Sequence, residues 1–160
     1  MELRKVQSLA RIAALVALGF APLLSGRALA ADDSKLWQTN YKQALAQAAK
    51  ENKQVLLDFT GSDWCRYCIQ MDREVLSKPQ FESFASKKLV LVKLDFPRRK
   101  KLSANELQQN DQLQSQYGIE GFPTYVLLDA QGKEVRRVVG SVDGGPSVFI
   151  KWIEGAQKAE

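Results

Sequence analysis

Cys65 and Cys68 are the two cysteines of this chain, and two residues separate them at the junction between a strand-like run and a helix-like run. A Cys-x-x-Cys pair at such a junction is typical of thiol–disulfide exchange. The thiolate is the reactive form of cysteine, and a helix start stabilises it through unpaired backbone N–H groups and the positive end of the helix dipole. Because the spacing also lets the sulfurs close a small disulfide, we expect redox chemistry at this pair.

Two other roles would also fit a pair of cysteines at this spacing. A purely structural bridge over so short a loop would constrain the unfolded chain little, because the entropic gain grows with loop length. A structural zinc site needs about four ligands. The chain has no histidine and no second cysteine pair, so only carboxylates could complete such a site. We therefore predict no metal and no cofactor.

The residues between the cysteines are Arg66 and Tyr67. Arg66 is expected to lower the pKa of Cys65, because a nearby cation favours the thiolate; alternatively, it points into water and has little effect. Tyr67 is expected to pack or to contact substrate rather than to transfer protons, since the ordinary pKa of tyrosine is about 10.

The elements that position the pair follow from hydrophobic patterning. Residues 55–60 are apolar apart from Asp58 and threonine, as in a strand covered on both faces. A lone aspartate there costs free energy unless it is paired or protonated, which points to a role for Asp58; the other interpretation is a solvated acid near the strand edge. Further strands are predicted at 89–96, 124–128 and 134–139, and helices at 36–51, 68–76, 79–85, 106–117 and 147–157.

Strands that alternate with helices predict an α/β fold whose central sheet is parallel, with helices on both faces. The turn at 129–132 adds a hairpin, so the last strand makes the sheet mixed. Pro79 is placed as the first residue of a helix, and Ser103 and Glu106 have the spacing of a capping box.

Residues 1–30 read as a secretory signal: a basic start, an interrupted apolar run, then Ala28-Leu29-Ala30 before the predicted cleavage site. A membrane anchor is the alternative, but the apolar run is shorter than the roughly 20 residues of a spanning helix. Residues 31–160 would form one domain in an oxidising, periplasmic or secreted location. That portion has nineteen Lys or Arg against seventeen Asp or Glu, so nothing suggests nucleic acid. The basic run 98–101 fits a solvated loop, an acidic partner or an anionic membrane face.

Taken together, these pieces resemble the thioredoxin superfamily over residues 36–157. The most specific are Trp64-Cys65-Arg66-Tyr67-Cys68 and, about fifty residues later, Gly121-Phe122-Pro123-Thr124. The lead-in Gly61-Ser62-Asp63 is most similar to that of secreted thioredoxin-like proteins and of the thioredoxin-type domains of disulfide reductases and isomerases. The chain departs from typical thioredoxins in one extra residue between Asp58 and Cys65, and in lacking a kinking proline in the helix after the cysteines.

The resemblance implies a role for each matching position. Cys65 would be the exposed nucleophile and Cys68 the buried resolving thiol. Asp58 would take the proton of Cys68, with Lys93 close to it. Pro123 would be a cis-proline facing the sulfurs, so that Phe122 offers backbone groups to an extended substrate. With Trp64, Arg66 and Tyr67, these two residues would form the substrate-binding surface.

The function expected from the sequence is thiol–disulfide exchange with cysteine-containing exported proteins. The direction, whether reductase, oxidase or isomerase, stays open. A reductase would need an external redox partner protein. We expect a monomer with no stable membrane insertion once the signal is removed. The alternative is a binding module of the same fold, which holds a client through Trp64, Phe122 and Pro123 with little redox turnover.

Overall fold

The computed structural model describes residues 36–155, and the predicted signal segment, residues 1–30, lies outside that range. No helix within the described range is both long and apolar enough to cross a bilayer. In chain order the elements are β1 (Trp37–Gln38), α1 (Tyr41–Glu51), β2 (Gln54–Thr60), α2 (Arg66–Met71), the π-helical turn η2 (Asp72–Leu76), α3 (Pro79–Lys88), β3 (Leu89–Asp95), α4 (Ala104–Gln116), β4 (Thr124–Leu128), β5 (Glu134–Val139) and α5 (Gly145–Gly155).

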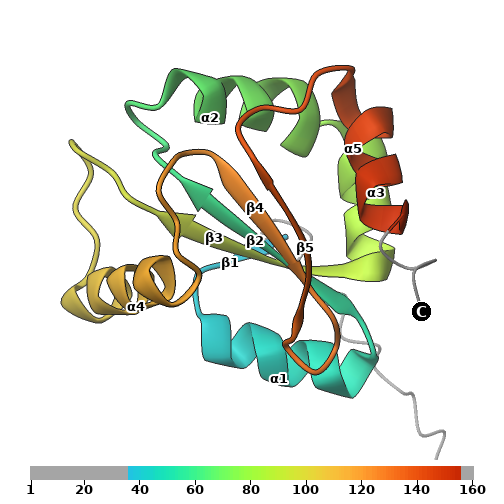
Figure 1. Cartoon of the computed structure of the whole chain (residues 1–160), viewed down its shortest axis with the longest axis horizontal. Helices are drawn as coiled ribbons and strands as arrows, with labels where there is room; N and C mark the ends of the chain where they lie inside the picture. Colours follow the sequence, from blue (N-terminus) through green and yellow to red (C-terminus); the bar gives the residue numbers. More distant parts are fainter. Residues whose placement is uncertain (1–35, 156–160) are drawn as a thin grey trace, which may run out of the picture. The chain divides into compact units, whose positions relative to one another are not determined.

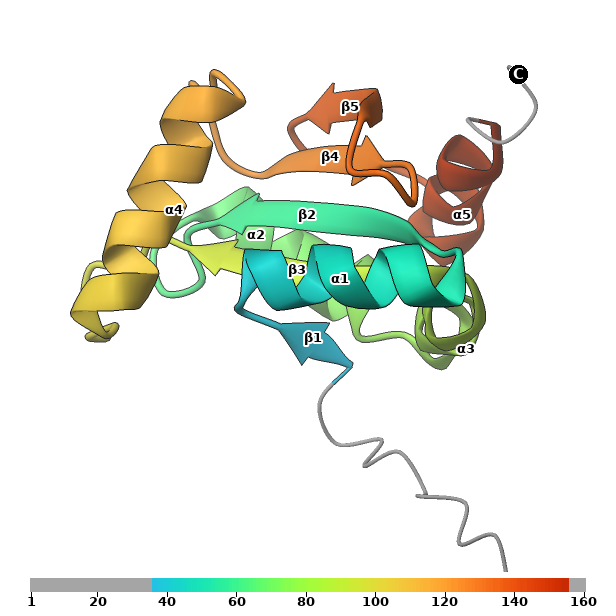
Figure 2. The same ribbon diagram turned by 90° about the horizontal axis from the view of Figure 1, so that it is seen from below.

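A single five-stranded sheet has the order β1-β3-β2-β4-β5, with β1 and β5 at its edges (Figure 2). The central strand β2 pairs in parallel with β3 and antiparallel with β4, and β5 returns antiparallel along β4. The mixed sheet predicted from the sequence is confirmed. Since β2 is the middle strand, the residues that follow it emerge at the centre of one end of the sheet.

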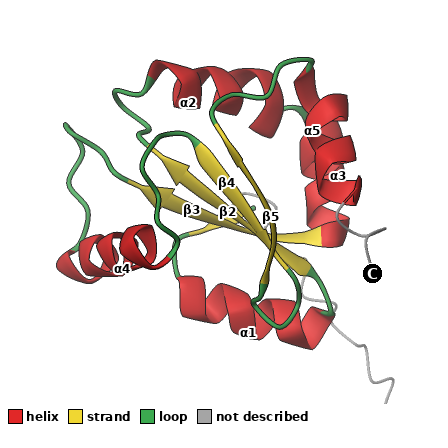
Figure 3. Cartoon of the chain, in the orientation of Figure 1, coloured by secondary structure: helices red, strands yellow, loops and turns green. Residues whose placement is uncertain are grey.

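Helices cover both faces of the sheet, as predicted (Figures 1 and 3). Side chains of a strand point alternately to opposite faces, and the strands therefore build two cores. Leu57 and Phe59 of β2 belong to the core that includes Ala44 and Ala48 of α1. Leu56 belongs to the other core, with Phe81 of α3 and Phe149 of α5. Met71 of α2 belongs to the same core as Leu56, so the face of the sheet that carries Leu56 is the one that α2 covers.

The predicted helix at 36–51 is wrong over its first five residues. Trp37 and Gln38 instead form the edge strand β1, which pairs in parallel with Leu91 and Val92. The helix begins only after Asn40, whose side chain accepts a hydrogen bond from the Gln43 N–H. An N-cap of this kind outweighs the weak apolar periodicity upstream, because it satisfies a backbone donor that would otherwise be unpaired.

The helix after the cysteines contains a feature that the sequence did not predict. It passes at Asp72 into the π-helical turn η2 without any kinking proline. A π-turn holds an extra residue and shifts the helix face. Here the register still buries Met71 and Val75 against the sheet, while the side chain of Asp72 is half exposed.

Candidate active site

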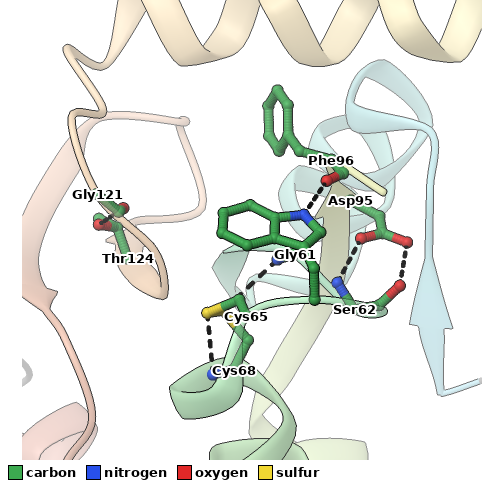
Figure 4. Close-up of a disulfide and its surroundings, with 9 residues drawn as sticks. Gly61, Ser62, Cys65, Cys68, Asp95, Phe96, Gly121 and Thr124 are labelled. Carbon is green, nitrogen blue, oxygen red and sulfur yellow. Dashed lines mark hydrogen bonds between the residues drawn. A yellow bond between two sulfur atoms is a disulfide. The ribbon is translucent and has the colours of Figure 1, made fainter. Parts of the chain in front are cut away.

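The turn from β2 to α2 carries the cysteines and depends on close packing at Gly61. A Cβ atom at this position would lie 2.6 Å from the indole ring of Trp64, so only glycine lets the ring lie against the backbone. The turn is tied to β3 as well, because the Ser62 N–H and hydroxyl donate to the two carboxylate oxygens of Asp95 at 2.9 and 2.6 Å (Figure 4). The chain is thereby held in place immediately before Cys65.

Cys65 and Cys68 form a disulfide, and their Cα atoms are 5.2 Å apart. Cys65 is the N-cap of α2, and its Sγ accepts the backbone N–H of Cys68 at 3.2 Å. The Gly61 N–H donates to the Cys68 Sγ at 3.5 Å (Figure 4). Backbone donors thus point at both sulfurs, the arrangement that favours a thiolate at a helix start. Both cysteines are largely covered, Cys65 being 6% and Cys68 3% exposed. The expected burial of Cys68 is met, whereas the expected exposure of Cys65 is not met in this disulfide-bonded form, where the two sulfurs cover each other.

Asp58 lies buried in the middle of the sheet, on the face that carries α2. It is 2% exposed, and within the described residues its Oδ1 has no hydrogen-bond partner. The pKa of Asp58 is raised to about 7, mainly by burial; the nearby charge of Lys93 opposes this rise, and the charges of Asp72 and Asp95 add to it. The alternative of a solvated acid at a strand edge is excluded by this burial. A carboxyl group with such a pKa can both hold and release a proton near neutral pH.

Lys93 is the register partner of Asp58 across the β2–β3 pair and lies on the same face of the sheet. Its ammonium group, however, contacts the Asp72 Oδ1 at 3.2 Å and lies 5.3 Å from the centre of the Trp37 ring. Lys93 is therefore close to Asp58, as the resemblance implied, but its ion pair is with η2. Because the partner of this lysine is Asp72, the buried carboxyl of Asp58 keeps its raised pKa.

An aromatic cluster borders the cysteines. The Trp64 Nε1–H donates to the Phe96 carbonyl at 2.7 Å, and the Trp64 and Phe122 rings meet edge to face, 5.9 Å between centroids. The Phe96 and Phe122 rings are 5.1 Å apart. The Phe122–Pro123 peptide bond is cis, and Thr124 closes this turn by donating to the Gly121 carbonyl at 2.8 Å. The structure thus brings Trp64 and Phe122 together, although 58 positions separate them in the sequence.

Arg66 and Tyr67 both point away from the core. Tyr67 is 55% exposed, and Arg66 is exposed and lies beside an open hollow of about 520 Å³ next to the turn. Within residues 36–155 no hydrogen bond or ion pair involves the Arg66 guanidinium. Both side chains are therefore free to meet another molecule.

Sequence reasoning missed Asp63 and Asp72. The carboxylate of Asp63 accepts the backbone N–H groups of Arg98, Arg99 and Lys100 at 2.9, 2.7 and 3.0 Å, and these bonds hold the pKa of Asp63 below its ordinary value. The basic run is thus part of the site. Asp63 and Arg98 are 35 positions apart, so no local pattern could have linked them; an acid directly before Trp64 was the one available signal.

The comparisons agree with this geometry. Residues 41–157 match the family model of the thioredoxin-like domain. The chain is 36% identical over 122 residues to the disulfide bond reductase DsbH of Chlamydia pneumoniae, covering 76% of this chain and 72% of that protein. It is 34% identical to the thiol:disulfide interchange protein DsbD of Photorhabdus laumondii over 66% of this chain but only 18% of that longer protein.

Solved structures lead to the same family. A structure of a DsbH oxidoreductase superposes with a TM-score of 0.72 at 35% identity, over 78% of this chain and 85% of that one. The reduced C-terminal domain of Neisseria meningitidis DsbD superposes with a TM-score of 0.56 at 26% identity, over 72% of this chain and 92% of that one. With a matched family model, a relative named as a disulfide reductase and a disulfide at a helix start, this chain belongs to the thioredoxin-like family and is a thiol–disulfide oxidoreductase.

Proposed function

We propose that this protein is an exported disulfide reductase that acts on cysteine-containing proteins outside the cytosol. The observation that carries the proposal is the Cys65–Cys68 pair at the start of α2, with backbone N–H groups directed at both sulfurs. The reductive direction rests on the similarity to a disulfide bond reductase at 36% identity. Export rests on the signal-like residues 1–30, with residues 31–160 as the mature domain.

The reaction begins with the reduced protein. The Cys65 thiolate attacks one sulfur of a client disulfide, forms a mixed disulfide and displaces the other client sulfur as a thiolate. The Cys68 thiolate then attacks the Cys65 sulfur, and the second client thiolate leaves. Two electrons pass to the client, and the Cys65–Cys68 disulfide seen in the structure is the product. An external dithiol protein must reduce it again, so a redox partner is part of the proposal.

Asp58 is proposed to accept the proton that Cys68 loses before its attack. Its burial and its pKa of about 7 support this role, because efficient proton transfer needs an acceptor whose pKa lies near the working pH. Lys93 is proposed to help the carboxylate once it is charged, since its charge lowers the pKa of Asp58. Both residues lie on the face of the sheet that carries α2, the helix of the cysteine pair.

The client is proposed to contact the rim of the cysteine pair. Trp64 and Phe122 form a half-buried aromatic surface, and Arg66 and Tyr67 project from the start of α2. Pro123 would expose the backbone of Phe122 to an extended client segment. A monomer would suffice for this contact.

Reduction of insulin disulfides by the mature protein, with a dithiol regenerating the site, tests the proposal. Wild type should turn over, and Cys65→Ser should be inactive. Cys68→Ser should accumulate a mixed disulfide through Cys65, and mass spectrometry of the trapped species would identify a client. If the wild type binds clients but never reduces a disulfide, the binding-module alternative replaces the enzyme.

A further inference from the structure

The basic run at 98–101 is a preorganised rim of the cysteine site. Three backbone N–H groups of this run bind the Asp63 carboxylate, and the Arg99 guanidinium donates to the Asp63 carbonyl. Asp63 lies two residues before Cys65. A loop held by four hydrogen bonds to one residue keeps its side chains close to that residue, so the cations of the run are positioned beside the reactive pair.

The side-chain charges of this rim are largely uncompensated. Asp63 is engaged with backbone groups, and the Arg98 guanidinium lies 4.0 Å from the centre of the Trp64 ring rather than against an acid. The side chain of Lys100 is 64% exposed, and its ion pair with Asp95 is long, at 3.9 Å. The Asp95 carboxylate already accepts two hydrogen bonds from Ser62. Lys101 is exposed and, among the described residues, takes part in no hydrogen bond or ion pair. Exposed cations without a close acidic partner attract anions over about a Debye length.

Arg66 and Arg99 line the same hollow. The hollow of about 520 Å³ has Trp64 and Ile69 among its apolar lining and receives Arg66 from α2 and Arg99 from the basic run. Its acids are occupied: Asp63 by the run, and Glu74 by Arg73 and Gln70. Within the part of the chain that the structure describes, Arg66 is unpaired, and Arg99 donates only to the uncharged Asp63 carbonyl. A concave site with apolar walls and these two arginines fits a short segment that carries carboxylates, because guanidinium groups bind carboxylates through paired N–H donors.

We propose that this hollow and the adjoining run dock an acidic segment of the client, next to the client cysteine that Cys65 attacks. The inference deepens the proposed reductase function and rests on it. A client polypeptide is favoured over an anionic membrane because Arg66 and Arg99, which form no ion pair within the described residues, line a hollow whose wall includes the residues on either side of Cys65. A flat bilayer would meet protruding lysines rather than a concave site. The rim would thus select clients by charge as well as by their disulfide.

Three disulfide-linked peptides that differ only beside the cysteine test this inference. They carry three glutamates, three glutamines or three lysines, and stopped-flow fluorescence gives the second-order rate constant for reduction by the reduced protein. At low salt we expect the glutamate peptide to react about tenfold faster than the glutamine peptide and the lysine peptide more slowly. In about 0.5 M salt the difference should fall below about twofold, because screening weakens exposed charges.

The variant Arg66→Glu/Lys101→Glu should reverse the order of the glutamate and lysine peptides. Lys42→Glu/Lys50→Glu makes the same change of charge on exposed positions of α1, on the opposite face of the sheet, and should keep the wild-type order. Dividing each rate constant by that of the glutamine peptide for the same protein removes any effect of Arg66 on the reactivity of the Cys65 thiolate. Equal rates for the three peptides with wild type, or the same reversal in the α1 variant, would overturn the inference.

Two further outcomes separate the remaining possibilities. If the glutamine peptide is not reduced at all, the proposed function fails rather than the docking surface alone. If wild type reduces all three peptides equally but sediments with anionic phospholipid vesicles, and Arg66→Glu/Lys101→Glu does not, the rim is a membrane-binding surface and the client proposal is wrong.

Discussion

Replacing Asp58 by asparagine should change how the stability of the oxidised protein depends on pH. The folded protein keeps a proton on Asp58 up to about pH 7, because burial raises its pKa from the ordinary 3.8. The unfolded chain releases this proton near pH 4. The contribution of Asp58 to the free energy of unfolding is therefore fully present below about pH 4, and it is lost as the pH rises through about 7.

The magnitude follows from the two pKa values. At about 1.36 kcal/mol per pKa unit, a rise from 3.8 to about 7 corresponds to about 4 kcal/mol lost between pH 4 and pH 8. Asparagine carries no titrating proton, so Asp58→Asn should lack this loss. Absolute stabilities will differ too, because asparagine brings its own donors into the core, but the pH dependence isolates the titration.

Urea unfolding of both proteins at several values between pH 4.5 and 8 gives the needed comparison. The free energy of unfolding of Asp58→Asn, taken relative to wild type, should increase by several kcal/mol across this range. The oxidised form is used because disulfide-bonded cysteines do not titrate. Asp111→Asn, an exposed change on α4, should follow the wild type. Parallel curves for wild type and Asp58→Asn would refute the reasoning, since the buried acid would then have an ordinary pKa.

Three other substitutions test separate parts of the structure. Gly61→Ala should displace the Trp64 ring, which would lie 2.6 Å from the new methyl group, and cost about 1–3 kcal/mol; tryptophan fluorescence and urea unfolding report both effects. Asp63→Ala should free the run at 98–101 and speed tryptic cleavage there, whereas unchanged cleavage would show that the clamp is unimportant. Phe149→Ala empties a fully buried position between two helices and the sheet, and should cost about 3–5 kcal/mol in urea unfolding.

Much of the fold was accessible from local pattern. Apolar runs and turns predicted β2, β3 and the β4–β5 hairpin, and Ser103 caps α4 by accepting the Glu106 N–H as its spacing indicated. The pattern failed at residues 36–40, where a two-residue edge strand leaves too little periodicity to be seen. It also gave no sign of η2, because a π-turn is set by how the helix packs on the sheet.

In the candidate site, too, some residues were evident from local sequence and others only from the tertiary structure. The amino-acid order alone was enough to select Cys65, Cys68 and Asp58, since two-residue spacing and an acid within an apolar strand are visible in a few adjacent positions. The partner of Lys93, by contrast, was decided by tertiary structure: Asp72 lies 21 positions away and reaches the lysine only through the packing of α2 and η2.

The basic run is the clearest example of what folding adds. In the sequence it fits a solvated loop as well as a binding surface. In the structure Asp63 draws it to the cysteine turn from 35 to 37 positions away. The physical reason is that composition determines which groups carry charge, whereas the effect of a charge depends on its distance and burial, and those are known only once distant segments have packed together.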